Sequence, residues 1–305
     1  MPAPTHLRHR SYGTYAFLAV GLLITLGLVA LGVRSLFQSD RPLEQGLSAP
    51  LDGRRAGTDA EEAKTRTARP EPTLPTAAQV MNARAFAESR SGVVSFAVID
   101  TSDNLHCYRC RTRYASASVV KAMLLVAYLT SLAEENRALS ASHHAQLEAM
   151  IRVSDNQSAT EIYSHVGDAG IRRLAKQAGM RDFSVSGGWS TARVTAADQA
   201  RFFTFIDKPM SAKDREYASQ LLSSIVASQA WGIPEVSRPE WNTLFKGGWR
   251  RTRRGQLVHQ VARLERGDAV MAIAVLTDGN PREAYGRATI RGIARRLLDP
   301  GSGGP

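Results

Sequence analysis

The chain has 305 residues, of which 43% are apolar, and its formal net charge is +11 at pH 7. This apolar content is enough for a packed core, so a wholly disordered chain is excluded. The charge comes mainly from arginine, because only six of the 39 basic residues are lysines. The one dense basic run, 250–254, is interpreted as a solvated hairpin tip, and no recognition helix or stacking motif accompanies it. We therefore expect no nucleic-acid partner.

The N-terminal region predicts a membrane anchor. Residues 15–33 are almost continuously apolar and uncharged, a length that crosses a bilayer as a helix. Arg8 and Arg10 precede this stretch, so the positive-inside rule places residues 1–14 in the cytoplasm and the remainder outside. The alternative is a signal peptide cleaved near residues 30–32, which would make the protein secreted.

Composition divides the rest of the chain into a linker, one domain and a tail. Residues 34–76 are rich in Pro, Gly, Arg, Glu and Asp without a hydrophobic period, which predicts a disordered linker, and residues 299–305 predict a frayed tail. Residues 77–298 then form the domain. Its predicted elements are a helix at 78–88, strands at 93–99 and 105–114, helices over 118–224, strands at 243–245, 257–264 and 269–276, and a helix at 287–298.

Strands at both ends of the domain with helices between them predict an α/β (α+β) fold. We expect an antiparallel sheet flanked by helices, with an inserted all-helical subdomain, and a site in the groove between the two parts.

The two cysteines, Cys107 and Cys110, cannot supply the four ligands of a structural zinc site, and we expect neither a metal nor a cofactor. We interpret the pair as a local turn, closed by a disulfide in an oxidising compartment. A thioredoxin-like redox centre is the alternative, although no βαβ unit surrounds the pair.

Ser118 and Lys121 are the first candidate catalytic residues. They open a helix that is apolar almost all round, so Lys121 should be buried with a depressed pKa. The three-residue spacing puts both side chains on one helical face, where an amine that loses its proton could activate the serine hydroxyl. An N-cap serine followed by a snorkelling lysine is the ordinary alternative.

Two further polar segments follow in the chain. Ser154-Asp155-Asn156 interrupts apolar helices, so that Ser154 could relay a proton and Asn156 could hold a substrate amide; a helix cap is the alternative. Lys246 is followed by Gly247, Gly248 and Trp249 at the end of a predicted short strand, where the lysine offers a carboxylate-binding charge and the glycines admit a substrate close to the backbone. The ordinary alternative is a strand-ending turn. Three other tryptophans are interpreted as packing residues: Trp189, Trp231 and Trp241.

Taken together, the three segments resemble the Ser-x-x-Lys, Ser-Asp-Asn and Lys-Thr-Gly motifs of class A β-lactamases and penicillin-binding proteins. The resemblance implies a serine hydrolase acting through an acyl-enzyme on a β-lactam or a peptidoglycan-derived acyl-D-amino-acid peptide. It implies Ser118 as nucleophile, Lys121 as base and Ser154 as relay, and it places the backbone N–H groups of Ser118 and Trp249 in the oxyanion hole. Asn156, Lys246, Gly247, Gly248 and Trp249 would bind the substrate.

This chain departs from the class A pattern in the loop that carries the deacylating glutamate. Residues 181–193 are short and glycine-rich, and Asp182 is their only carboxylate. Gly247 also replaces the hydroxyl residue of the third motif, and the short interval between Ser118 and Ser154 implies a trimmed helical subdomain. Release of an acyl group should therefore be slow.

Two alternatives to this mechanism stay open from the residues alone. A Ser-His-Asp triad could use His259 or the pair His143-His144, but no Gly-x-Ser-x-Gly elbow accompanies them. A non-catalytic envelope-binding protein could also keep the same fold after losing turnover. Covalent labelling by a penicillin separates these hypotheses.

Overall fold

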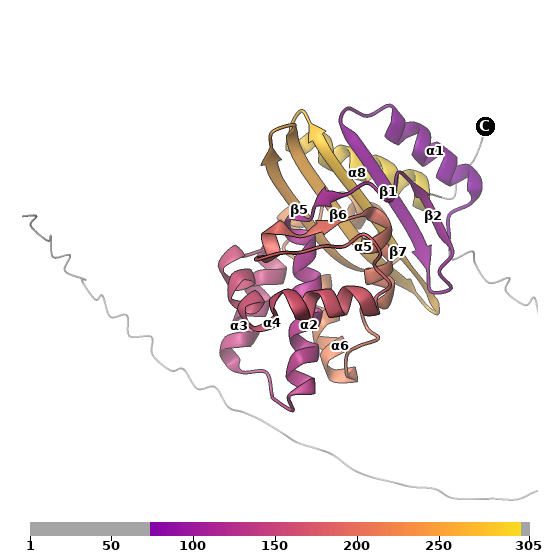
Figure 1. Cartoon of the computed structure of the whole chain (residues 1–305). Coiled ribbons are helices and arrows are strands. Elements are labelled where there is room, and N and C mark those ends of the chain that lie inside the picture. Colours follow the sequence, from indigo (N-terminus) through magenta and orange to yellow (C-terminus); the bar gives the residue numbers. More distant parts are fainter. Residues whose placement is uncertain (1–73, 300–305) are drawn as a thin grey trace, which may run out of the picture. The chain divides into compact units, whose positions relative to one another are not determined.

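The computed structural model describes residues 74–299, which form a five-stranded antiparallel sheet with helices against both of its faces (Figure 1). The strand order is β2-β1-β7-β6-β5, so that the first long strand pairs with the last and β5 is an edge strand. A separate two-stranded ribbon joins β3 and β4. The strands are β1 (Val93–Asp100), β2 (Leu105–Tyr108), β3 (Tyr114–Ala115), β4 (Arg193–Val194), β5 (Asn242–Thr252), β6 (Gly255–Arg266) and β7 (Ala269–Asn280).

The first and last helices of the domain contact each other and strands of the sheet. The helix Ala196–Phe205 also contacts the sheet. The remaining long helices gather as a helical part beside the sheet (Figure 1). The helices are α1 (Ala77–Glu88), α2 (Val120–Glu134), α3 (Ala141–Glu148), α4 (Asn156–Gln177), α5 (Ala196–Phe205), α6 (Ala212–Ser223), α7 (Ile233–Ser237) and α8 (Glu283–Leu298). Four short helical turns connect them: η1 (Ala117–Val119), η2 (Ala149–Val153), η3 (Trp189–Thr191) and η4 (Ala227–Gln229).

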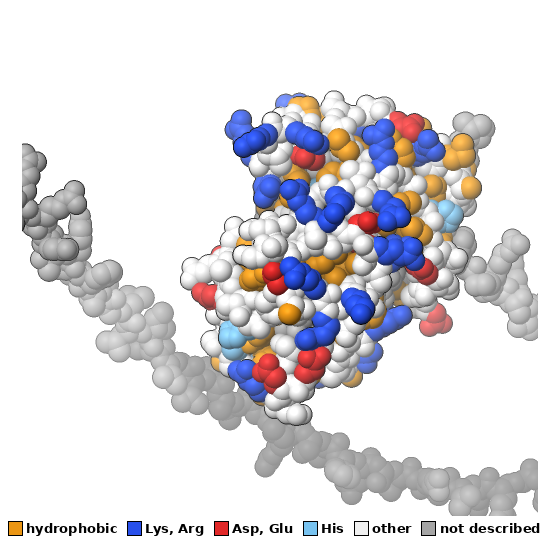
Figure 2. Space-filling model, in the orientation of Figure 1, with side chains coloured by type: hydrophobic (Ala, Val, Ile, Leu, Met, Phe, Trp, Pro, Cys, Tyr) orange, Lys and Arg blue, Asp and Glu red, His pale blue; other side chains and the backbone are white. Residues whose placement is uncertain are grey.

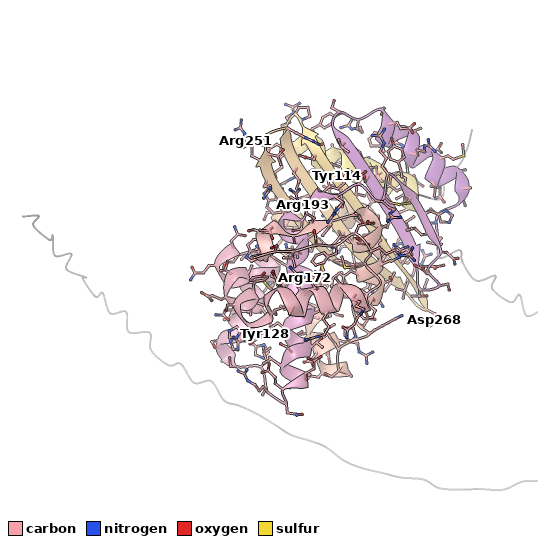
Figure 3. All side chains as sticks on the ribbon, viewed as in Figure 1. Tyr114, Tyr128, Arg172, Arg193, Arg251 and Asp268 are labelled. Atoms are coloured by element: carbon pink, nitrogen blue, oxygen red, sulfur yellow. A yellow bond between two sulfur atoms is a disulfide. The ribbon has the colours of Figure 1, made fainter. Side chains whose placement is uncertain are left out.

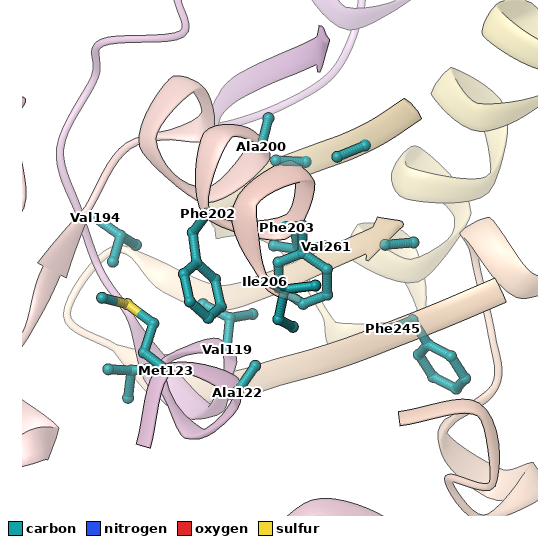
Figure 4. Packing of buried hydrophobic residues seen from close by; sticks show 14 of the residues in the cluster. Val119, Ala122, Met123, Val194, Ala200, Phe202, Phe203, Ile206, Phe245 and Val261 are labelled. Atoms are coloured by element: carbon teal, nitrogen blue, oxygen red, sulfur yellow. The ribbon is translucent and has the colours of Figure 1, made fainter. Parts of the chain in front are cut away.

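The core holds the start of α2 against α5 and the sheet. Figure 4 shows Phe202 and Phe203 of α5 beside Val119 of η1 and Met123 of α2, and all four side chains are fully buried. The first ten residues of α2 are all buried, which fits their almost wholly apolar sequence. The residues that begin α2 are therefore held rigidly.

The predicted fold class is confirmed, and several boundaries differ from the prediction. The expected strand 105–114 ends at Tyr108, because Tyr114 and Ala115 leave the large sheet to pair with β4. The expected short strand 243–245 extends to Thr252, so that only Arg253 and Arg254 form the hairpin turn. Lys246 and the residues after it thus lie inside β5 and not at its end.

The predicted cytoplasmic segment, membrane anchor and nearly all of the linker lie outside the described residues, as does most of the predicted tail. Among residues 74–299, one helical stretch, Ala117–Glu134, is long and apolar enough to cross a membrane. This stretch includes the central helix α2, whose side chains are mostly buried within the domain.

The predicted disulfide is present in the structure, between Cys107 and Cys110. It closes the turn that follows β2, and the main-chain oxygen of Cys110 accepts a hydrogen bond from Ala197 N at the start of α5. The pair therefore has a structural position at the junction of the sheet with α5.

Candidate active site

Ser118 lies in the helical turn η1, directly before α2, and its side chain is half-buried. The preceding Ala117 has a φ of 45°, a left-handed conformation that is costly for a residue with a Cβ. Such backbone strain persists only where the surrounding structure imposes it. Here the strained turn places Ser118 just before the N-terminal end of a buried helix.

Lys121 follows within the first turn of α2 and is fully buried. Its ammonium donates to the main-chain oxygens of Ser154 (2.6 Å) and Asp155 (3.0 Å) and to Asn156 Oδ1 (2.8 Å). Ser154 Oγ lies 3.4 Å away. The structure thus joins the first and second predicted segments through one lysine.

The hydrogen bonds of Lys121 do not fit a snorkelling lysine, which was the ordinary alternative for this residue. A snorkelling lysine would reach solvent, whereas this one is enclosed and held by oxygens of another segment. No hydrogen bond joins Lys121 to Ser118 in the described structure, and the ammonium donates to the oxygens of Ser154, Asp155 and Asn156 instead. Burial lowers the pKa of Lys121 to about 8, against the opposing effect of the Asp155 charge.

The second segment contains the helix cap that the sequence offered as the alternative, and the oxygens on either side of that cap contact Lys121. Asp155 is the N-cap of α4, and its carboxylate accepts from Ser158 N at 2.7 Å. Ser154, immediately before it, has a left-handed backbone with a φ of 64°. The cap therefore turns the chain so that the oxygens of Ser154 and Asn156 both face Lys121.

The third segment runs along the edge strand β5, next to η1. A Cβ at Gly248 would lie 2.6 Å from Ser118 N and 3.0 Å from Val119 N, so only glycine allows this approach. The close contact places the backbone of β5 beside the backbone N–H of Ser118. An edge strand has unpaired groups along its free side, which is the arrangement that an oxyanion site needs.

Gly247 has a different neighbour, which explains why no hydroxyl residue stands there. A Cβ at Gly247 would lie 3.2 Å from the ring of Trp231. The rings of Trp231 and Trp249 meet edge to face at 6.0 Å, and the Arg287 guanidinium lies 5.0 Å and 5.8 Å from their centroids. An indole thus fills the space that a larger side chain at Gly247 would need.

Lys246 is fully buried in β5 and donates to the main-chain oxygen of Gly247 at 3.1 Å. Burial, together with the nearby positive charge of Lys121, lowers the pKa of Lys246 to about 7. The charge of Lys121 therefore disfavours the charged form of Lys246.

Trp189 is a site residue that sequence reasoning missed. It was interpreted as a packing residue, but its half-buried ring centroid lies 5.1 Å from Lys121 Nζ, and its Nε1 donates to Thr160 Oγ1 at 3.1 Å. Nothing in the pattern around Trp189 signals this, because the contact depends on the path of a loop between distant helices. Arg287, which lies in α8 far from the motifs in sequence, was missed for the same reason.

Asp182, the only carboxylate in the loop 181–193, forms an ion pair with Arg111, with N–O distances of 3.1 Å and 3.2 Å. Its backbone N–H donates to Asp198. The face of Lys121 nearest this loop is thus covered by an aromatic ring, and the Asp182 carboxylate is held elsewhere.

The histidine alternative does not fit the structure at His259. Its Nδ1 accepts from Thr277 N at 3.1 Å, so Nε2 carries the proton and donates to the Ala115 oxygen at 3.0 Å. Burial lowers the pKa of His259 to about 4. Both ring nitrogens are committed to the backbone, and none is left for Ser118. Within residues 74–299, no group of three His, Cys, Asp or Glu side chains could hold a metal ion.

Comparison with known proteins yields one family. The model of the β-lactamase enzyme family matches residues 140–300, more than half of the chain, and this range includes the second and third segments but begins after Ser118. A search of curated proteins finds no match.

Solved structures give the same architecture. The chain is similar to a β-lactamase from Sphaerobacter thermophilus (18% identity, TM-score 0.63), with 72% of this chain and 94% of that one covered. A β-lactamase from Chitinophaga pinensis has 12% identity and a TM-score of 0.64, over 72% and 97% of the two chains. An ancestral class A β-lactamase has 18% identity and a TM-score of 0.60, over 72% and 98%.

Proposed function

This chain belongs to the β-lactamase enzyme family of serine hydrolases, and we propose that Ser118 is its nucleophile, acylated by a β-lactam or by an acyl-D-amino-acid peptide of the cell wall. The observation that carries the proposal is the enclosure of Lys121, which lies three residues after Ser118, is fully buried and is held by the oxygens of Ser154, Asp155 and Asn156. A lysine that only packed would not need three polar acceptors from a separate helix cap.

In the proposed reaction, neutral Lys121 accepts the Ser118 hydroxyl proton while Oγ attacks the carbonyl carbon of the substrate. The C–N bond then breaks, and Ser154 Oγ, 3.4 Å from the lysine, passes a proton to the leaving nitrogen. With a pKa of about 8, roughly a tenth of Lys121 is neutral at pH 7. The backbone N–H groups of Ser118 and Trp249 stabilise the oxyanion.

In this proposal one buried lysine and four other residues have different roles in binding the substrate. Lys246 is fully buried and attracts a substrate carboxylate through its charge, while Asn156, Gly247, Gly248 and half-buried Trp249 line the approach. Release of the acyl group is slow, because Trp189 occupies the side of Lys121 that faces the loop.

The test is covalent labelling of the purified full-length chain with a fluorescent penicillin. We expect one label per chain, lost in Ser118→Ala and strongly slowed in Lys121→Met, which keeps the packing but has no amine. Ser116→Ala is the matched control, since Ser116 precedes the same helix and its Oγ donates only to the adjacent Ala117 oxygen. Absence of labelling in the wild type would leave the non-catalytic binding hypothesis.

We further propose that residues 15–33 anchor the protein in the cell membrane with the domain outside the cytoplasm. The Cys107–Cys110 disulfide supports this, because such bonds persist mainly in oxidising compartments. Protease added to intact spheroplasts should digest the domain, and alkaline extraction should leave the protein in the membrane. Recovery of a shortened chain in the medium would favour the secreted alternative.

A further inference from the structure

A pocket lies well away from Ser118, where the end of β1 meets the C-terminal ends of α4 and α5. Its volume is about 680 Å³, within the range of small-molecule sites. In the sheet register, Gly248 pairs with His259, His259 with Leu276, and Leu276 with Ser95. Asp100, which borders the pocket, is five residues further along β1, or about 17 Å at the rise of a strand.

The inner wall of this pocket is apolar. Met180 and Ala178 are buried, and Phe183 and Phe205 are partly buried where they pack against the core. A pocket that only collected solvent between charged side chains would not need two aromatic rings. The wall suits an apolar group of a ligand.

The rim of the pocket carries an excess of positive charge. Two of its cations are neutralised, since Arg172 pairs with Asp168 (3.1 Å) and Arg201 with Asp103 (3.4 Å). The carboxylate of Asp100 is occupied by hydrogen bonds from its own turn. Three further rim cations have no ion pair or hydrogen bond from their side chains within residues 74–299: Lys176, Arg181 and Lys208.

Helix geometry explains only one of these three charges. Lys176 lies in the last turn of α4, where a cation complements the helix dipole. Arg181 and Lys208 lie in the segments after α4 and after α5, so three separate parts of the chain bring unpaired cations to one concave surface. On the face of the molecule drawn in Figure 2, Lys and Arg side chains are more prominent than Asp and Glu.

We propose that this pocket binds a small organic anion, in which a phosphate or carboxylate group is carried on an apolar body. The anionic group would lie among Lys176, Arg181 and Lys208, and the apolar body against Phe183 and Phe205. Charge-assisted hydrogen bonds from convergent donors hold the anion, and the apolar wall distinguishes this ligand from a free inorganic ion. The site is independent of acylation at Ser118.

The test is isothermal titration calorimetry on the full-length chain in a non-ionic detergent, with three probes. Phenyl phosphate carries both features, inorganic phosphate only the charge, and phenyl glucoside only the ring. We expect phenyl phosphate to bind one site per chain, roughly tenfold more tightly than either of the others. Equal affinity for phenyl phosphate and inorganic phosphate, or no saturable binding of phenyl phosphate, would overturn the proposal.

A pair of charge-matched variants locates the binding. Lys176→Gln with Lys208→Gln removes two rim charges from exposed side chains, and we expect the affinity for phenyl phosphate to fall about tenfold. Arg251→Gln with Arg254→Gln removes the same charge at the β5–β6 hairpin, and Figure 3 shows Arg251 far from Arg172 at the border of the pocket. Equal weakening by both pairs would show attraction to the net charge alone and would refute the site.

Discussion

Exchange of Trp189 for glutamate should slow the acylation of Ser118 and speed the release of the acyl group. The Trp189 ring lies 5.1 Å from Lys121 Nζ, and Nε1 is held by Thr160. A carboxylate at that distance interacts with an ammonium by about 3 kcal/mol at an effective dielectric constant of 20. Partial solvent screening reduces this, so the pKa of Lys121 should rise from about 8 by roughly one to two.

The two steps should then change in opposite directions. A higher pKa leaves less neutral Lys121 at pH 7, so labelling of Ser118 by a fluorescent penicillin should slow by about ten- to a hundredfold. The new carboxylate can activate a water molecule for attack on the ester, and general-base assistance of this kind is worth about a hundredfold or more. The lifetime of the adduct should therefore shorten by at least about tenfold.

Trp189→Gln is the matched control, because it has nearly the same shape as the glutamate variant without the base or the charge. Like the glutamate variant it loses the indole, with its cation–π contact, worth about 1 kcal/mol, and its hydrogen bond to Thr160, and it should acylate at least as fast as the wild type. The assay is the decay of fluorescence from the labelled protein after excess penicillin is removed, with thermal melting to show that each variant is folded. Equal adduct lifetimes in the glutamate and glutamine variants would refute the reasoning.

Three further outcomes follow from the site. The rate of Ser118 labelling should rise with pH between about 6 and 9 with an apparent pKa near 8, because only neutral Lys121 acts as base; a profile flat across this range would contradict that role. Lys246→Met should raise the free energy of unfolding at pH 6 by roughly 2 to 5 kcal/mol, measured by urea denaturation. The reason is that Lys246 is charged at this pH, below its folded pKa of about 7, and burial disfavours that charge. The same variant should lose most labelling, and a loss of stability would contradict this explanation. Gly248→Ala should cost roughly 1 to 3 kcal/mol of stability and nearly abolish labelling, because its Cβ would meet Ser118 N. Gly267→Ala is the comparison for melting and labelling, because its Cβ meets open space and its cost comes only from its own positive φ of 57°; it should melt earlier than the wild type but keep labelling.

Burial of Lys121 was predictable from sequence, because the residues around it at the start of α2 are apolar almost all round. The partners of Lys121 were not predictable in detail, since they lie more than thirty residues further along and face it only through the turn at Ser154. Local pattern thus predicted the unusual environment of the lysine, and tertiary contacts determined how its charge is satisfied.

The glycines after Lys246 show where local reasoning failed. Two consecutive glycines ordinarily weaken a strand, which is why the strand was expected to end there. In the structure β5 continues through them, because Gly248 fits against Ser118 N and Gly247 fits against Trp231. Their small size serves contacts with residues that are distant in sequence, and no local rule contains those contacts.

The pairing of β1 with β7 also constrains how the protein can be made. The centre of the sheet joins the first long strand to the last, and α1 contacts α8, with Gln79 Nε2 donating to the Asp299 oxygen at 2.9 Å. Strand β1 and helix α1 therefore cannot form these contacts until β7 and α8 have been synthesised. If the domain crosses a membrane as it is synthesised, β1 can pair with β2 early, but its other edge, which pairs with β7, stays open on the far side until nearly the whole chain has arrived. A nascent chain stopped before Ala269 would therefore expose β1 to chaperones and proteases.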